Sequence, residues 1–259
     1  MTDLQYRYIL GTRVDATSYD DASARILQWA RAGESRCVCA CNVHMVMEGC
    51  DSPDFQKVIN AADLVTSDGM PLVWVLRRLG LKDQTRVYGP DLTLKVCRAA
   101  AEAGIPVGLY GGTQEVLDVL QRSYRARFPQ LQIGYTYAPP FRPLTREEDE
   151  AVVEAINASG TRILLIGLGC PKQEHWVAQH RGRVQAVMLA VGAAFDFHSG
   201  RVKQAPGWMR GCGLEWAFRL LMDPRRLWRR YFKNNPRFLW LVMRQLLAGV
   251  ENRDRFGAS

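Results

Sequence analysis

Short runs of aliphatic and β-branched residues alternate with longer helix-like stretches from Arg13 to about Val191. This alternation is typical of a parallel sheet, because each parallel connection needs a crossover, usually a helix, to carry the chain back. The predicted strands are Arg36–Ala40, Ala62–Thr66, Ile105–Tyr110, Gln132–Tyr137, Arg162–Gly167 and Val184–Val191. We therefore expect an α/β fold in which flanking helices cover one parallel sheet.

Helix starts between the strands carry signals of their own. Thr145 and Glu148 have the spacing of a capping box, in which the two side chains satisfy backbone N–H groups of the first turn. Thr113 follows a Gly-Gly pair, and Pro71 follows a strand end. Helices that begin directly after strands are expected of a Rossmann-like sheet.

The composition changes after Gly200. The last 59 residues hold 13 of the 34 basic residues, 4 of the 26 acidic residues and four of the seven Trp. The rest of the chain is almost neutral, so the net charge of +8 is concentrated in the tail. This asymmetry indicates one localised contact with an anionic partner and excludes a uniformly cationic coat for nucleic acid. We predict an α/β core at residues 1–203 and a basic helical appendage at residues 204–259.

Two prolines predict where helices of the appendage begin. Asp223-Pro224 and Asn235-Pro236 each place an N-cap residue before a proline suited to the first helical position, which divides the tail into three helices. The middle helix is amphipathic, with basic Arg225, Arg226, Arg229, Arg230 and Lys233 opposite apolar Leu227, Trp228, Tyr231 and Phe232. It either docks its apolar side on the core, or it is an interfacial helix at a membrane or an arm that binds anions.

Cysteine usage and the N-terminus indicate the compartment. The seven cysteines are odd in number, and Cys37, Cys39 and Cys41 alternate along one strand, which favours buried, reduced thiols. We see no signal peptide at the N-terminus, and no apolar run is longer than Phe238–Met243, which is far shorter than the roughly 20 residues of a spanning helix. We expect a cytoplasmic protein that contacts the inner face of the membrane peripherally.

Several familiar motifs are missing. The sequence has no Gly-x-x-x-x-Gly-Lys-Ser/Thr, no His-Glu-x-x-His, no Cys-x-x-Cys and no Gly-x-Ser-x-Gly. Gly167-Leu168-Gly169 lacks the third glycine of a dinucleotide fingerprint, and no Asp-x-Asp is present to hold a divalent ion. We therefore expect neither a cofactor nor a metal site.

Polar residues follow the predicted strands. Asp68 comes directly after the second strand, and Asn42 comes just after the first. Carboxyl ends of parallel strands meet at one edge of the sheet, where ligands bind, so these residues are predicted to meet there with Arg86 and Gln173. The alternative role of Asp68 is to cap the next helix. The histidines are weak candidates, although His44 and His175 could reach the crevice, and His180 is expected on a helix surface.

A set of segments in order along the chain carries a specific resemblance. The segments are Asn42, Thr66–Gly69, Arg86–Asp91, Leu109–Gly112, Gly167–Glu174, Val191–Asp196, Arg201–Pro206, Leu214–Trp216 and the stretch from Arg219 to Arg237. Together they resemble the WecG/TagA/CpsF glycosyltransferase family over nearly the whole chain.

The resemblance implies an activity and its substrates. It implies inverting, metal-independent transfer of a sugar from a UDP-sugar to a polyprenyl-diphosphate-linked sugar, typically N-acetylglucosamine on undecaprenyl diphosphate. Such a reaction serves cell-surface polysaccharide or teichoic acid synthesis. The donor sugar, which is N-acetylmannosamine, its uronic acid or a related hexose, stays open, as does a homo-oligomeric state.

The resemblance also implies roles for residues. Asp68 matches the catalytic base, and the appendage arginines that close over the active site are Arg219, Arg226 and Arg229. Substrate-binding positions are Asn42, Arg86, Gly111, Gly112, Gly169 and Gln173, and membrane-docking positions are Trp228, Tyr231 and Phe232. One departure is Ala40, where many members have Thr, which Cys41 or His44 could replace only if the geometry allows it.

The chemistry of sugar transfer agrees with these roles. An acceptor hydroxyl is a poor nucleophile, so a carboxylate such as Asp68 must take its proton. The leaving UDP gains charge, which arginines can stabilise.

Two other functional classes fit the sequence less well. An NAD-linked oxidoreductase acting on a nucleotide sugar would lack its Gly-x-Gly-x-x-Gly motif, and a basic nucleic-acid-binding module would leave Asp68 without a role.

Overall fold

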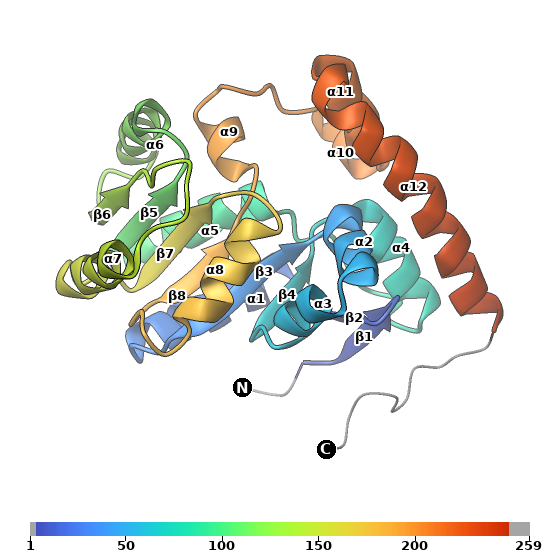
Figure 1. Cartoon of the computed structure of the whole chain (residues 1–259), viewed down its shortest axis with the longest axis horizontal. Coiled ribbons are helices and arrows are strands. Elements are labelled where there is room, and N and C mark those ends of the chain that lie inside the picture. The colour runs from blue at the N-terminus through green and yellow to red at the C-terminus, as the bar shows by residue number, and fades with distance from the viewer. Residues whose placement is uncertain (1–3, 249–259) are drawn as a thin grey trace.

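The computed structural model describes residues 4–248, and within them the main sheet has six parallel strands in the order β4-β3-β8-β7-β5-β6 (Figure 1). The strands are β3 (Arg36–Cys41), β4 (Leu64–Ser67), β5 (Val107–Gly111), β6 (Ile133–Tyr137), β7 (Ile163–Gly167) and β8 (Val187–Ala190). The six predicted strands are confirmed, and no end shifts by more than three residues. Since all six are parallel, their carboxyl ends lie at one edge of the sheet.

Helices cover both faces of this sheet, as a parallel sheet requires. One face packs on α1 (Tyr19–Arg31), α5 (Gly89–Glu102) and α6 (Gln114–Arg127). The other packs on α2 (Val43–Asp51), α3 (Pro53–Asn60), α4 (Met70–Arg78), α7 (Arg146–Ala158) and α8 (Lys172–His180). The capping box of Thr145 and Glu148 at α7 is confirmed.

A β-hairpin near the N-terminus was not predicted. It consists of β1 (Tyr6–Ile9) and β2 (Thr12–Asp15), which pair antiparallel around a turn at Leu10 and Gly11. Both turn residues have positive φ, 50° and 82°. Two-residue hairpin turns of this kind usually carry Asn-Gly, so Leu at the first position hides the signal.

The cysteine prediction is confirmed. Cys37, Cys39 and Cys41 point to the same face of β3 and are buried there in the core. All seven cysteines fall within residues 4–248 and are free thiols. Burial raises the pKa of the Cys37 thiol to about 12 and also raises the pKa values of Cys39 and Cys41, so the three thiols of β3 stay protonated at neutral pH.

The prediction for His180 is wrong, because the side chain is 2% exposed rather than on a helix surface. Its ring stacks on Trp176 at 3.8 Å between centroids, and its Nε2 lies 2.8 Å from a carboxylate oxygen of Asp149. The residue is therefore a packed histidine that joins α8 to α7.

After β8 the chain forms α9 (Ala194–His198), α10 (Gly207–Gly211), α11 (Glu215–Met222) and the long α12 (Pro224–Leu247) (Figure 1). The start at Pro224 is confirmed, but the predicted break at Asn235-Pro236 is wrong, because Pro236 lies inside α12. Pro236 is exposed, so the carbonyl four residues earlier that loses its partner can bond to water. The buried side of α12, formed by Leu227, Asn234, Phe238 and Val242, continues across the proline at helical spacing.

This buried side joins the appendage to the core. Phe238 and Val242 belong to the same hydrophobic cluster as α2 and α4. The side-chain amide of Gln245 accepts from the N–H of Leu10 at 2.9 Å and donates to the carbonyl of Tyr8 at 2.8 Å, which fixes α12 to the hairpin. The boundary at residue 203 stays a prediction. Among residues 4–248, no helix has both the length and the apolar character to cross a bilayer.

Candidate active site

A cavity of about 440 Å³ lies at the carboxyl ends of β3 and β4, beneath α11 and α12. Its polar end is lined by Asn42, His44, Asp68, Arg86, Glu215 and Arg219. Its apolar end is lined by Met70, Trp74, Phe238, Leu239, Val242, Met243 and Leu246. The core supplies the floor of this cavity and the appendage supplies its roof.

Asp68 stands between the end of β4 and α4. Its carboxylate accepts a hydrogen bond from the N–H of Gly89 at 2.8 Å and one from the side-chain amide of Asn42 at 3.4 Å. The N-cap of α4 is Gly69, so Asp68 does not cap the helix that follows it; the N–H that it accepts belongs to Gly89, the first residue of α5 (Gly89–Glu102). Asn42 is itself the N-cap of α2 through its Oδ1, which leaves its amide N–H₂ directed at Asp68.

Burial raises the pKa of the Asp68 carboxyl from 3.8 to about 6. The guanidinium of Arg86 opposes this shift, whereas the carboxylate of Glu215 adds to it. A carboxylate with a pKa near 6 is ionised at neutral pH and is a stronger proton acceptor than an exposed aspartate. Asp68 therefore has the properties of a general base.

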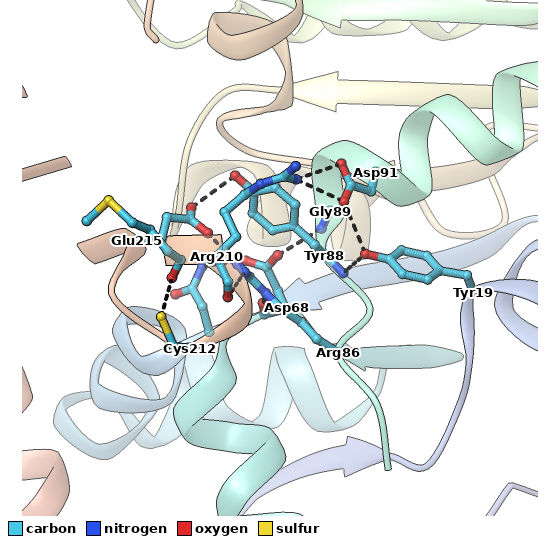
Figure 2. A network of polar contacts seen from close by, with 11 residues as sticks. Tyr19, Asp68, Arg86, Tyr88, Gly89, Asp91, Arg210, Cys212 and Glu215 are labelled. Carbon is cyan, nitrogen blue, oxygen red and sulfur yellow. Dashed lines mark hydrogen bonds and ion pairs between the residues drawn. The ribbon is translucent and has the colours of Figure 1, made fainter. Parts of the chain in front are cut away.

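Arg86 connects Asp68 to the appendage (Figure 2). Its Nε donates to the main-chain carbonyl of Asp68, and its Nη2 donates to Glu215 Oε2 at 2.6 Å. Its guanidinium also lies over the ring of Tyr88, 4.1 Å from the centroid. Glu215 lies within the matching segment Leu214–Trp216 but had no predicted role, although it is the one acidic residue between Gly200 and Asp223.

A second group of predicted residues lies outside the cavity, at the ends of β5, β7 and β8. Gln173 is buried, accepts from the N–H of Gly192 at 3.1 Å and donates to Glu174 at 2.7 Å. Gly111 ends β5, Gly112 follows it, and Gly169 follows β7 with open space where a Cβ would stand. A Cβ at Gly111 would lie 2.6 Å from the carbonyl oxygen of Gly167, so this position requires glycine.

The three predicted arginines of the appendage do not share one environment. Arg219 lines the cavity, and its guanidinium lies over the ring of Phe197 at 5.5 Å. Arg229 is exposed and lies over Trp228 at 5.5 Å. The side chain of Arg226 is outside the described part of the chain.

The three predicted membrane-docking residues also differ in their exposure. Trp228 and Phe232 are 48% and 73% exposed, whereas Tyr231 lines the cavity and contacts Trp216 edge to face. Leu227 is buried and the aromatic pair Trp228 and Phe232 is exposed, and contact of this pair with lipid stays a prediction.

Ala40 lacks the hydroxyl that the family's usual Thr would supply. Cys41 and His44, the two candidates to replace that hydroxyl, are placed differently. Cys41 is fully buried in the core, on the face of β3 opposite to Ala40. His44 lines the cavity and lies 3.3 Å from the amide of Asn234 on α12. Burial lowers the pKa of His44 to about 4, so its imidazole is neutral.

In residues 4–248, no three His, Cys, Asp or Glu side chains are grouped so that they could hold a metal ion.

A family model described as the glycosyl transferase WecG/TagA/CpsF family matches residues 7–252. This match covers nearly the whole chain and confirms the resemblance found in the sequence. The protein belongs to the WecG/TagA/CpsF family and is an enzyme, a UDP-sugar-dependent glycosyltransferase.

Proposed function

We propose that the enzyme transfers N-acetylmannosamine, its uronic acid or a related hexose from UDP to a polyprenyl-diphosphate-linked acceptor of the N-acetylglucosamine type. The observation that carries this proposal is the composition of the cavity. The half-buried carboxylate of Asp68 lines the cavity with the guanidinium groups of Arg86 and Arg219, and apolar side chains form the rest of its wall. A lipid diphosphate that carries a sugar combines these three kinds of chemistry.

In the proposed reaction, Asp68 takes the proton of the acceptor hydroxyl as its oxygen bonds to the anomeric carbon of the donor. The bond to UDP breaks at the same time, and its electron pair leaves with the diphosphate. Attack from the face opposite to UDP inverts the anomeric configuration. Asn42 and the N–H of Gly89 hold the carboxylate in place for this step.

The charge of the leaving diphosphate needs cations. We assign this role to Arg219, Arg226 and Arg229, which replace the metal that an Asp-x-Asp motif would bind. Arg219 already lines the cavity, whereas the exposed Arg229 requires a movement of the appendage. The glycines after β5 and β7, together with Gln173, are proposed to bind the donor, since ligands of parallel sheets bind at these strand ends.

The apolar end of the cavity suits a lipid-linked acceptor. Trp74, Leu239 and Met243 are partly exposed along it, between α4 and α12. Arg78 and Arg230 line the same cavity and can pair with anionic groups of the lipid. Trp228 and Phe232 on α12 are proposed to enter the headgroup region at the inner face of the membrane.

The test is a transfer assay with a panel of UDP-sugars and a short-chain lipid-diphosphate acceptor, with the product linkage determined by NMR. We expect one UDP-sugar to give an inverted glycosidic product, with the same rate in EDTA. A strict requirement for added magnesium would contradict the metal-free mechanism. Oxidation of the UDP-sugar with NAD, or retention on DNA but not on anionic liposomes at physiological salt, would favour the other two classes.

Changes at the exposed aromatic pair should separate membrane binding from catalysis. We expect Trp228→Ala and Phe232→Ala each to weaken binding to anionic liposomes by about tenfold, since a partly inserted aromatic ring contributes roughly 1–2 kcal/mol. Turnover of a water-soluble acceptor should stay at the wild-type value. The matched control is Phe141→Ala, because Phe141 is 95% exposed and follows β6, at the opposite edge of the sheet from β4. Equal losses in a liposome sedimentation assay for all three variants would contradict the assignment.

A further inference from the structure

The appendage brings an acid, Glu215, to the active site, although the proposed role of the appendage is to supply cations. Glu215 begins α11, and its side chain is buried against the segment that leads from β4 to α5. Figure 2 shows its carboxylate directed at Arg86 and Tyr88, next to Asp68. None of the steps assigned above uses this group.

We propose that Glu215 is a positioning residue that couples docking of the appendage to the orientation of Arg86 and, through Arg86, to the catalytic base. This inference rests on the proposed function in one respect, the role of Asp68 as the base.

Both oxygens of the Glu215 carboxylate are engaged by the core. Oε2 accepts from Arg86 Nη2 at 2.6 Å, and Oε1 accepts from the hydroxyl of Tyr88 at 2.9 Å. Arg86 and Tyr88 are two residues apart, so one carboxylate can bridge them. The side chains of Arg86 and Glu215 are only 15% and 12% exposed. Removal of one charge from a buried pair of this kind leaves the other charge without a partner, which is unfavourable. The docked position of the appendage therefore depends on this pair.

The remaining nitrogens of Arg86 fix its orientation. Nε donates to the main-chain carbonyl of Asp68, and Nη1 donates to the carbonyl of Arg210 on α10 at 3.3 Å. The guanidinium therefore links the main chain of the base to two helices of the appendage. Without Glu215, Nη2 would lose its partner, and the orientation of Arg86 would rest on its two bonds to main-chain carbonyls.

The same contact places Arg219. Glu215 and Arg219 are four residues apart on α11 and therefore lie on the same side of the helix. Anchoring of Glu215 on the core brings Arg219 to the cavity that Asp68 lines. One ion pair thus positions a base on the core and a cation on the appendage for the same reaction.

The charges around Asp68 make the coupling measurable. The charged groups that shift its pKa are Arg86 and Glu215, and the groups that hydrogen-bond to it are the amide of Asn42 and the N–H of Gly89. Arg219 and Arg230 from the appendage and the neutral His44 line the same cavity. The other titratable neighbours of Asp68 are Tyr19, Cys41 and Tyr88, which are uncharged near neutral pH because burial raises the pKa of each. Removal of the charge of Glu215 leaves the cation of Arg86 unopposed, so the pKa of Asp68 should fall.

The experiment compares wild type, Glu215→Gln and Glu215→Asp with a water-soluble acceptor. For Glu215→Gln we expect kcat to fall by about 10- to 100-fold while KM for the UDP-sugar changes by less than about threefold. The acid limb of the pH profile, near pH 6 in wild type, should move to lower pH. Glu215→Asp keeps the charge and should recover part of kcat, with the acid limb at the wild-type pH.

Asp51→Asn is the matched control. Asp51 pairs with Lys233 and Arg237 of α12, so its loss also removes ion pairs between the appendage and the core, but far from Asp68. This variant should keep the kcat and the acid limb of wild type. An acid limb of Glu215→Gln that stays at the wild-type pH, or a fall in kcat as large for Asp51→Asn, would overturn the proposal.

Folding and the proposed function are tested separately. If Glu215→Gln does not fold, Tyr88→Phe removes one hydrogen bond to Glu215 and no charge. A fall in its kcat of about three- to tenfold supports the proposal, and a wild-type kcat overturns it. If Asp68→Asn stayed active and wild type had no acid limb near pH 6, the assignment of the base would fail, whatever Glu215 does.

Discussion

Replacement of Asp68 by Asn is expected to lower kcat by about 10²- to 10⁴-fold, the range for loss of a general base. The amide has nearly the same shape as the carboxylate, so the hydrogen bond from Gly89 can remain, but it cannot take the proton of the acceptor hydroxyl. Binding of UDP should stay within a few-fold of wild type. The measurements are steady-state turnover and calorimetric titration with UDP, and near-normal turnover would exclude Asp68 as the base.

Asp68→Asn is not expected to destabilise the folded protein at neutral pH. Burial raises the pKa of Asp68 from 3.8 to about 6, so the folded state binds its proton more tightly than the unfolded state. Its contribution to stability is complete below about pH 4 and is lost as the pH rises to about 6. At pH 7 the neutral amide avoids this cost, so Asp68→Asn should melt at the wild-type temperature or above it.

A control for charge removal lies at the other end of the same strand. Asp63 precedes β4 and pairs with Arg36 and Arg181, away from the cavity. Asp63→Asn should therefore lower the melting temperature and leave kcat unchanged, the opposite of the pattern for Asp68→Asn.

Arg219→Ala is expected to give the next largest effect, a fall in kcat of about a hundredfold even with a water-soluble acceptor. The reason is that a guanidinium in a partly enclosed cavity stabilises the charge of the leaving diphosphate more in the transition state than in the ground state. The matched control is Arg225→Ala, which removes the same charge from an exposed position on α12. Its kcat should stay within about twofold of wild type.

The same assay decides how far the appendage takes part in catalysis. If Arg219→Ala kept wild-type turnover on the water-soluble acceptor and lost only liposome binding, the appendage would be an anchor alone. A fall for Arg229→Ala as large as that for Arg219→Ala would show that α12 moves during the reaction, since Arg229 is exposed in this structure.

The local pattern of the sequence was enough to predict the strands of the sheet and half of the residues of the site. The predicted strands follow from apolar runs between helix caps, and parallel strands end at one edge. Asp68 and Asn42 therefore had to meet once β3 and β4 were neighbours, and they lie 3.4 Å apart. The matching segments of the family were enough to identify the class of enzyme.

Other features were decided by tertiary contacts. Pro236 is a local signal for a helix start, but the buried side of α12 packs on the core on both sides of it, and this packing outweighs one lost hydrogen bond. His180 is polar by composition, yet its stack on Trp176 and its contact with Asp149 bury it.

The remaining half of the site depended on contacts between distant parts of the chain. Arg86 and Glu215 are 129 positions apart, and no periodicity or capping rule connects residues at that separation. Gln173 follows a strand end as predicted, but it packs against Gly192 at another part of the edge, because the order of strands places β8 and β7 beyond β3. The sequence by itself determined which elements form and which edge of the sheet carries the chemistry. Only the tertiary structure decided which side chains share one cavity, because that depends on strand order and on where the appendage docks.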